Sequence, residues 1–160
     1  MVFFLILLNS SMRSSGFFLF LLFSSVVIKA QELNPVSWAF SLEKSGDSLY
    51  IIQADARIEP HWKLYSHFIK EGGPIPTDLH IDSLSGIKKV LEIKEEGKRH
   101  GPDKDPIFGI DVSYYMDKVR ITRKIYVSEQ ATKIKGYVLY MVCNDEQCLP
   151  PRTLPFELTP

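Results

Sequence analysis

Cys143 and Cys148 are the residues of this 160-residue chain whose type and spacing could do chemistry. They are its only cysteines, and they follow directly after the apolar run 137–142. Two thiols this close in sequence can form a disulfide only if the backbone between them bends. Closing a loop of about six residues stabilises a fold by only about 2 kcal/mol. The pair is therefore poorly placed as a structural bridge and well placed as a reversible dithiol switch.

A purely structural disulfide and a metal site are the alternative interpretations of the two cysteines. A zinc site would need two of the four histidines, His61, His67, His80 and His100. Zinc ligands normally come in close pairs such as C-x₂₋₄-C with H-x₃₋₅-H. Only His61 and His67 approach the histidine spacing, at its outer limit. We therefore expect no metal and no cofactor, while the structural disulfide stays open.

An N-terminal apolar block indicates where the chain is delivered. Residues 17–28 are apolar apart from two serines and are followed by Lys29 and Ala30, a small residue suited to precede a cleavage site. Twelve residues match a secretory signal and fall short of the ~20 needed to span a bilayer. Residues 1–30 are thus predicted to be a signal peptide, with Met12 as a second candidate start. An uncleaved anchor made of both apolar runs is the alternative.

The mature chain, 31–160, is long enough for one domain with its own core. The removed segment carries Arg13 and Lys29 and no acidic residue, so the net charge falls from 0 to −2. This balance gives no electrostatic case for nucleic acid or, after cleavage, for a membrane. We expect a periplasmic or secreted protein, and such a compartment permits disulfides.

The mature chain has the hydrophobic pattern of strands. Alternation of apolar and polar residues predicts half-buried strands over 36–42, 49–58, 119–127, 137–141 and 154–158. Shorter candidates lie at 62–67, 77–82, 87–93 and 112–116, and no segment has a convincing helical face. Many short strands separated by turn residues predict an all-β, antiparallel β-sandwich. Segments 71–76 and 95–106 are expected to be loops, the second one long, polar and solvated.

Three segments resemble one family, the N-terminal periplasmic domain of the thiol:disulfide interchange protein DsbD. They are 137–151, with both cysteines and the following Leu-Pro-Pro; 62–66, Trp-Lys-Leu-Tyr-Ser; and 105–109, Asp-Pro-Ile-Phe-Gly, followed by Tyr114 and Tyr115. The resemblance covers about residues 33–160. This chain has one residue fewer between its cysteines than the better-known members, and the acidic pair of their cap loop is only partly kept, as Asp105.

The resemblance implies an immunoglobulin-like sandwich with the dithiol at one edge. It also implies that Cys148 forms the mixed disulfide with a partner and that Cys143 resolves it. Phe108 corresponds to the aromatic residue that caps the disulfide, and Tyr65 to an aromatic beside the site. The implied partners are thioredoxin-like periplasmic proteins, with a separate membrane protein as a further candidate electron donor. The implied activity is that of a thiol-disulfide oxidoreductase component, a protein-disulfide reductase.

The charges near the cysteines bear on their reactivity. Positive neighbours lower the pKa of a thiol, and here Asp145 and Glu146 lie between the two cysteines instead. We expect sluggish thiols that become reactive when a partner docks. The alternative function is a non-enzymatic β-sandwich that binds a protein and contains an inert structural disulfide.

Overall fold

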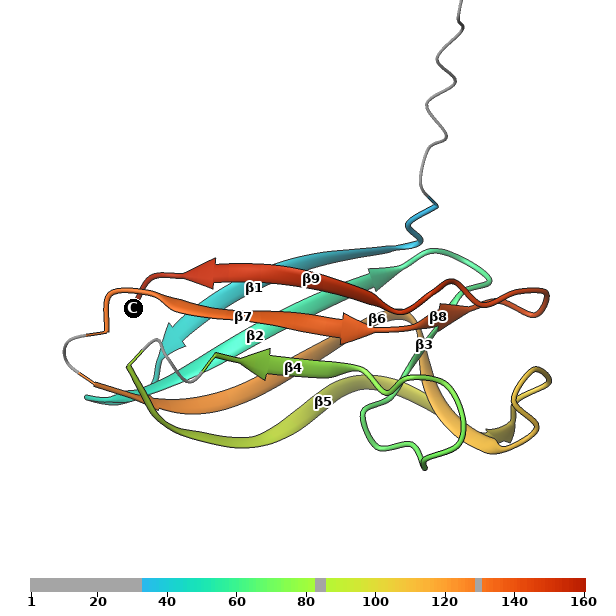
Figure 1. Ribbon diagram of the computed structural model, residues 1–160, viewed down its shortest axis with the longest axis horizontal. Helices are drawn as coiled ribbons and strands as arrows, with labels where there is room; N and C mark the ends of the chain where they lie inside the picture. The colour runs from blue at the N-terminus through green and yellow to red at the C-terminus, as the bar shows by residue number, and fades with distance from the viewer. Residues whose placement is uncertain (1–32, 83–85, 129–130) are drawn as a thin grey trace, which may run out of the picture. The chain divides into compact units, whose positions relative to one another are not determined.

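A computed structural model describes residues 33–82, 86–128 and 131–160. These residues form nine strands and no helix, which confirms the all-β prediction (Figure 1). The strands are β1 (Val36–Lys44), β2 (Leu49–Ile58), β3 (Lys63–Tyr65), β4 (Asp78–Ile81), β5 (Ile87–Lys104), β6 (Asp111–Val127), β7 (Ile134–Tyr140), β8 (Val142–Cys143) and β9 (Arg152–Leu158). The predicted signal peptide, 1–30, lies outside the described residues. Within the described part, no helix could cross a membrane.

The strands form two antiparallel sheets. The larger sheet has the order β1-β2-β6-β3-β8, and β5 pairs with β6. The smaller sheet has the order β4-β7-β9. Figure 1 shows the smaller sheet lying against the larger one. The predicted antiparallel, immunoglobulin-like β-sandwich is thereby confirmed.

The main core fills the space between the two sheets. Side chains alternate between core and solvent along a strand, so every second residue of β2 is buried, from Ile52 through Ala54 and Ala56 to Ile58. The smaller sheet contributes the apolar side chains that pack against them, namely Leu79, Ile81, Ile134, Val138 and Phe156. This core holds the strands from which the candidate site is built.

β6 is one long strand, whereas the sequence pattern predicted two, at 112–116 and 119–127. Asp117 lies between the two predicted segments and has a left-handed backbone with φ 66°. At this point β6 changes its partner on the edge opposite β5, since residues 118–126 pair with β2 and residues 114–115 pair with β3. A local bend of this kind interrupts the alternation without ending the strand. The apparent gap in the pattern is a strand irregularity.

The expected long loop at 95–106 is wrong over most of its length. β5 continues to Lys104 and stays paired with β6, with register shifts next to Gly97 and at the Gly101-Pro102 step. Among the described strands β5 pairs with β6 alone, so it forms an edge of the sheet. An edge strand tolerates charged residues, glycine and proline because one side of its backbone faces solvent. The composition of an edge strand therefore resembled that of a loop.

Three connections gather at one end of the sandwich, next to the short strands β3 and β8 (Figure 1). They are the β3–β4 segment 66–77, the β5–β6 turn 105–110, and the segment 144–151 between β8 and β9. The cysteines lie at this end.

Candidate functional site

The two cysteines form a disulfide across a tight turn. Cys143 ends β8, and Cys148 pairs with it through an isolated bridge that leaves the two Cα atoms 4.0 Å apart. The side chain of Asn144 accepts hydrogen bonds from the backbone N–H groups of Glu146 and Gln147, at 2.9 and 2.8 Å. The Asn144 N–H in turn donates to the Gln147 carbonyl. Asparagine stabilises turns in this way, so its side chain sets the bend that the disulfide requires.

The two sulfur-bearing residues differ in exposure. Cys143 is 1% exposed, whereas Cys148 is partly exposed. A small apolar cluster, separate from the main core, surrounds them; its buried members are Tyr65, Val112 and Cys143, and Ile69, Phe108, Ile110, Tyr114, Met141 and Cys148 pack against these. An attacking thiol can therefore reach Cys148 more easily than Cys143.

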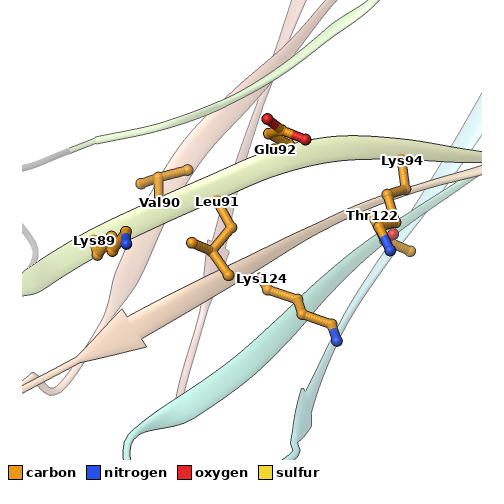
Figure 2. A pocket seen from close by; sticks show the side chains of 7 residues that line it. All are labelled: Lys89, Val90, Leu91, Glu92, Lys94, Thr122 and Lys124. Carbon is orange, nitrogen blue, oxygen red and sulfur yellow. The ribbon is translucent and has the colours of Figure 1, made fainter.

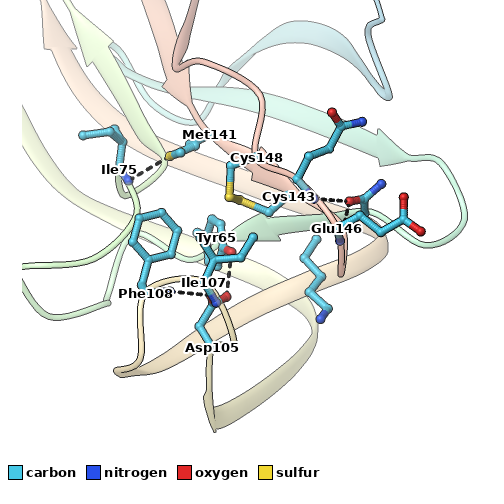
Figure 3. Close-up of a disulfide and its surroundings, with 12 residues drawn as sticks. Tyr65, Ile75, Asp105, Ile107, Phe108, Met141, Cys143, Glu146 and Cys148 are labelled. Carbon is cyan, nitrogen blue, oxygen red and sulfur yellow. Dashed lines mark hydrogen bonds between the residues drawn. A yellow bond between two sulfur atoms is a disulfide. The ribbon is translucent and has the colours of Figure 1, made fainter.

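The turn 105–110, which we call the cap turn, is organised by the buried side chain of Asp105. Its carboxylate accepts hydrogen bonds from the backbone N–H groups of Ile107 and Phe108, at 2.9 and 3.1 Å. It also accepts one from the Tyr65 hydroxyl at 2.7 Å (Figure 3). Asp105 is only 6% exposed; its hydrogen bond from Tyr65 is buried, and the two from the backbone are partly buried. Gly109 completes the turn with a left-handed φ of 70°, a conformation that glycine adopts without strain.

Phe108 projects from the cap turn toward the disulfide (Figure 3). Its ring meets that of Tyr65 edge-on, with 6.3 Å between the centroids. Tyr65 is fully buried, and burial, together with the hydrogen bond to Asp105, raises the pKa of its hydroxyl well above the ordinary value. The three residues that the family resemblance singled out, Tyr65, Asp105 and Phe108, thus lie together beside the cysteine pair.

Lys63 is a neighbour of the disulfide that the sequence reasoning missed. Its ammonium makes a 2.6 Å ion pair with Asp145, so acidic groups are not the only charges near the cysteines, contrary to expectation. The hydrogen bond from Lys63 holds the pKa of Asp145 below its ordinary value. The signal was present in the segment 62–66, because alternation along a strand places Lys63 on the same face as Tyr65.

A second missed element is the segment 66–77, which covers the site from another side. The backbone N–H of Ile75 contacts the Met141 sulfur at 3.5 Å (Figure 3). Gly73 comes so close to the cap-turn residue Ile110 that an added Cβ would lie 2.5 Å from its side chain. Phe68 and Ile75, both in this segment, are exposed by 56% and 37%. The segment therefore gives the site an apolar rim.

Glu95 fastens the start of this segment to the sheet. Its carboxylate accepts hydrogen bonds from the Ser66 hydroxyl, the His67 backbone N–H and the Tyr115 hydroxyl, at 2.6, 2.7 and 3.0 Å. The sequence analysis had assigned Glu95 to a solvated loop, and only its place on β5 brings it to this position.

The described residues contain no group of three or more His, Cys, Asp or Glu side chains that could hold a metal ion. His80 stacks on Tyr137 and His100 on Tyr114. A depression of about 540 Å³ lies on β5 and β6, lined among others by Lys89, Lys94 and Lys124 (Figure 2). None of the site residues described above lines it.

Comparison with known proteins places these features in a family. Residues 30–160 match the model for the N-terminal part of the thiol:disulfide interchange protein DsbD. No curated protein matches the chain in sequence. The N-terminal periplasmic domain of ScsB from Proteus mirabilis is similar in structure, with a TM-score of 0.56 and 17% identity over 78% of this chain and 47% of that one. The chain therefore spans about half the length of that structure.

The DsbD N-terminal domain of Neisseria meningitidis in its reduced form has a TM-score of 0.48 and 15% identity, over 77% of this chain and 85% of that one. The family match covers the whole described domain, and the resemblance predicted from the sequence is confirmed. This chain belongs to the family of the N-terminal domain of the thiol:disulfide interchange protein DsbD.

Proposed function

We propose that this domain relays electrons by thiol–disulfide exchange between its Cys143–Cys148 pair and thioredoxin-like partner proteins. The observation that carries the proposal is a disulfide with one buried and one partly exposed sulfur-bearing residue, beside an aromatic side chain on a turn. Family membership supports the same chemistry.

In the proposed exchange, a partner thiolate attacks Sγ of Cys148, the more accessible residue. A bond forms between the partner's sulfur and Cys148, and the bond between Cys148 and Cys143 breaks. The electron pair goes to Cys143, which leaves as a thiolate and later takes up a proton. A second thiol of the partner then attacks the mixed disulfide, releases the reduced domain and leaves the partner oxidised. The reverse sequence passes electrons onward.

The cap turn gives this exchange a gate. The attacking sulfur must approach along the S–S axis, and Phe108 packs in the same small cluster as both cysteines. Replacing Phe108 by alanine should therefore speed reduction of the disulfide by a small thiol such as dithiothreitol. An unchanged rate would show that the ring does not obstruct the sulfur.

The compartment follows from the same proposal. Residues 1–30 would direct export, and the domain would act in the periplasm, where thioredoxin-like proteins exchange disulfides. The similar ScsB domain is described as periplasmic. The electron donor would be a thioredoxin-like protein or a membrane protein with its own dithiol.

A trapping experiment tests the proposal. In the Cys143→Ser variant, Cys148 has no internal partner, so mixed disulfides with partners should accumulate. The protein would be produced with its leader in a bacterial periplasm, and adducts would be identified by non-reducing electrophoresis and mass spectrometry. The expected result is adducts with proteins of the thioredoxin fold, formed through Cys148.

The matched control is Cys148→Ser, which keeps the buried cysteine and should form few adducts. Equal trapping by both variants would contradict the assignment of Cys148 as the attacked residue. No adducts from either variant, together with a reduction potential below about −300 mV, would identify an inert structural disulfide instead.

A further inference from the structure

The register of the short strand β3 brings a positive charge to the buried cysteine. Lys63 is the direct antiparallel partner of Cys143 on β8. Side chains of directly paired residues point to the same face of a sheet, with Cβ atoms about 5 Å apart. Tyr65 and its partner on β6, Tyr114, share that face. Lys63 therefore stands beside Cys143 on the side of the sheet that carries the site.

Contacts on both sides hold the ammonium of Lys63 in this region. It makes a 2.6 Å ion pair with Asp145, in the turn between the cysteines, and lies 5.3 Å from the centre of the Tyr114 ring. The Lys63 side chain is 19% exposed, whereas that of Asp145 is 80% exposed. The ion pair is thus anchored on the sheet by Lys63, and the Asp145 carboxylate is exposed to solvent.

We propose that Lys63 stabilises the thiolate that Cys143 becomes when the disulfide opens, and that Asp145 competes with this thiolate for the ammonium. The proposal rests on the exchange proposed above, in which Cys143 is the leaving sulfur.

The chemistry of the step gives Lys63 its importance. As the attacking thiolate bonds to Cys148, negative charge passes to the sulfur of Cys143. A leaving thiol of lower pKa departs faster, and a nearby ammonium lowers that pKa. In the reverse direction the same thiolate is the internal nucleophile that attacks the mixed disulfide. By stabilising the Cys143 thiolate, Lys63 therefore affects the rate of exchange in both directions.

Other charged and titratable groups surround the site and oppose Lys63 or assist it. β5 and the cap turn contribute Asp103 and Asp105, and β3 and β6 contribute the hydroxyls of Tyr65 and Tyr114. The turn between the cysteines contributes Asp145 and Glu146, and the residues before β3 contribute His61. Asp105 already accepts three hydrogen bonds, and the Tyr114 hydroxyl donates to Asp103. Of these neighbouring groups and Lys63, only Lys63 is paired directly with Cys143 across the strands.

Two charge substitutions with opposite expected effects test the proposal. Lys63→Met keeps most of the length of the side chain and removes the charge, and should raise the pKa of Cys143 by about one unit. Asp145→Asn keeps the shape and frees the ammonium, and should lower that pKa. Lys63→Arg should retain most of the wild-type value. The pKa would be measured from thiolate absorbance against pH with Cys148→Ser as the background, so that Cys143 is the single thiol.

The rate at which dithiothreitol opens the disulfide in the two-cysteine protein is the second readout. At pH 7, Lys63→Met should slow opening about three- to tenfold and Asp145→Asn should speed it. The control is Lys124→Met, which removes a lysine nine positions beyond Tyr115 on β6, roughly 30 Å along the strand. It should change neither the pKa nor the rate.

The pair of variants separates electrostatics from structure, because both break the same ion pair. If the ion pair served only to hold the turn, both substitutions would shift the pKa and the rate in the same direction, and the proposal would be overturned. Unchanged values in Lys63→Met would overturn it as well. Dithiothreitol needs no protein partner, so these results stand whether or not the Cys143→Ser trap fills. If the trap stayed empty, only the proposed exchange with partner proteins would be refuted, and the proposed role of Lys63 would still be tested by the dithiothreitol rates.

Discussion

Replacing Tyr65 by phenylalanine removes one hydroxyl from the anchor of the cap turn and leaves the aromatic ring in place. The lost hydrogen bond joins the Tyr65 hydroxyl to the buried carboxylate of Asp105 at 2.7 Å. A hydrogen bond to a charged group contributes about 1.5–3 kcal/mol. The two backbone N–H donors to Asp105 remain, and so does the ring contact with Phe108. The cap turn should therefore keep its shape and open more often.

The magnitude follows from the change in the opening equilibrium. Each 1.4 kcal/mol is a factor of about ten in a population, so the open fraction should rise about ten- to a hundredfold. If a small thiol attacks Cys148 only in the open state, the rate of reduction rises by the same factor. The assay is reduction by excess dithiothreitol, quenched by alkylation and followed by mass spectrometry, alongside urea unfolding of the oxidised protein.

Two control variants distinguish opening of the cap from other effects. Tyr126→Phe removes the hydroxyl of an exposed tyrosine on the same sheet and should leave the rate unchanged. Ile121→Val lowers global stability by about 1 kcal/mol at a core position on β6, and should also leave the rate unchanged. A Tyr65→Phe protein that is less stable but reduced at the wild-type rate would refute the gate, because the reagent would then reach Cys148 with the cap closed.

Three further outcomes are expected from the packing of the domain. Burial raises the pKa values of the Tyr65 and Tyr115 hydroxyls above the ordinary 10.0, so the unfolded chain loses these protons at a lower pH than the folded one. The free energy of unfolding should therefore be constant below about pH 10 as far as these groups are concerned and should fall above it, less steeply in Tyr65→Phe. Urea unfolding should show that Glu95→Gln loses about 1–3 kcal/mol, since an amide cannot accept all three hydrogen bonds of the carboxylate. Gly136→Ala would put a Cβ 2.1 Å from a backbone oxygen of the facing strand and should cost about 2–3 kcal/mol, whereas Gly46→Ala, with its nearest neighbour at 3.5 Å, should be almost neutral. Equal unfolding midpoints for the two glycine variants would contradict the close approach of the β4 backbone to Gly136.

Strands that bury one face were predictable from the sequence because burial imposes alternation. β2 and β7 show it clearly, with every second residue buried over most of their length. The extension of β5 was not predictable, because an edge strand needs no apolar face and its glycines and proline sit at register shifts. The two-residue β8 is too short to show any period.

The candidate site divides in the same way. The spacing of Cys143 and Cys148 was enough to predict that they could meet, because four intervening residues allow a turn. Family resemblance pointed to Phe108, Tyr65 and Asp105. Lys63 was missed because its position depends on the pairing of β3 with β8, and these strands are about 80 positions apart. Alternation with Tyr65 is a local signal for the face on which Lys63 lies, but its place beside Cys143 depends on cross-strand register, which is a property of the fold.

The arrangement around the disulfide explains how the bond could open and close without loss of the fold. Closing a loop of about six residues contributes about 2 kcal/mol at most in the entropy model, which assumes an otherwise free chain. Here the turn is already held by the Asn144 hydrogen bonds and by the backbone bond from Leu149 to Val142. Leu64, fully buried in the main core, separately fixes β3 against β8. Since these contacts do not involve sulfur, reduction should release little more than the side chains of the small cluster beneath the cap turn. We therefore expect the sandwich to keep Lys63 and Cys143 side by side after reduction as well, which is the condition that repeated exchange at one sulfur requires.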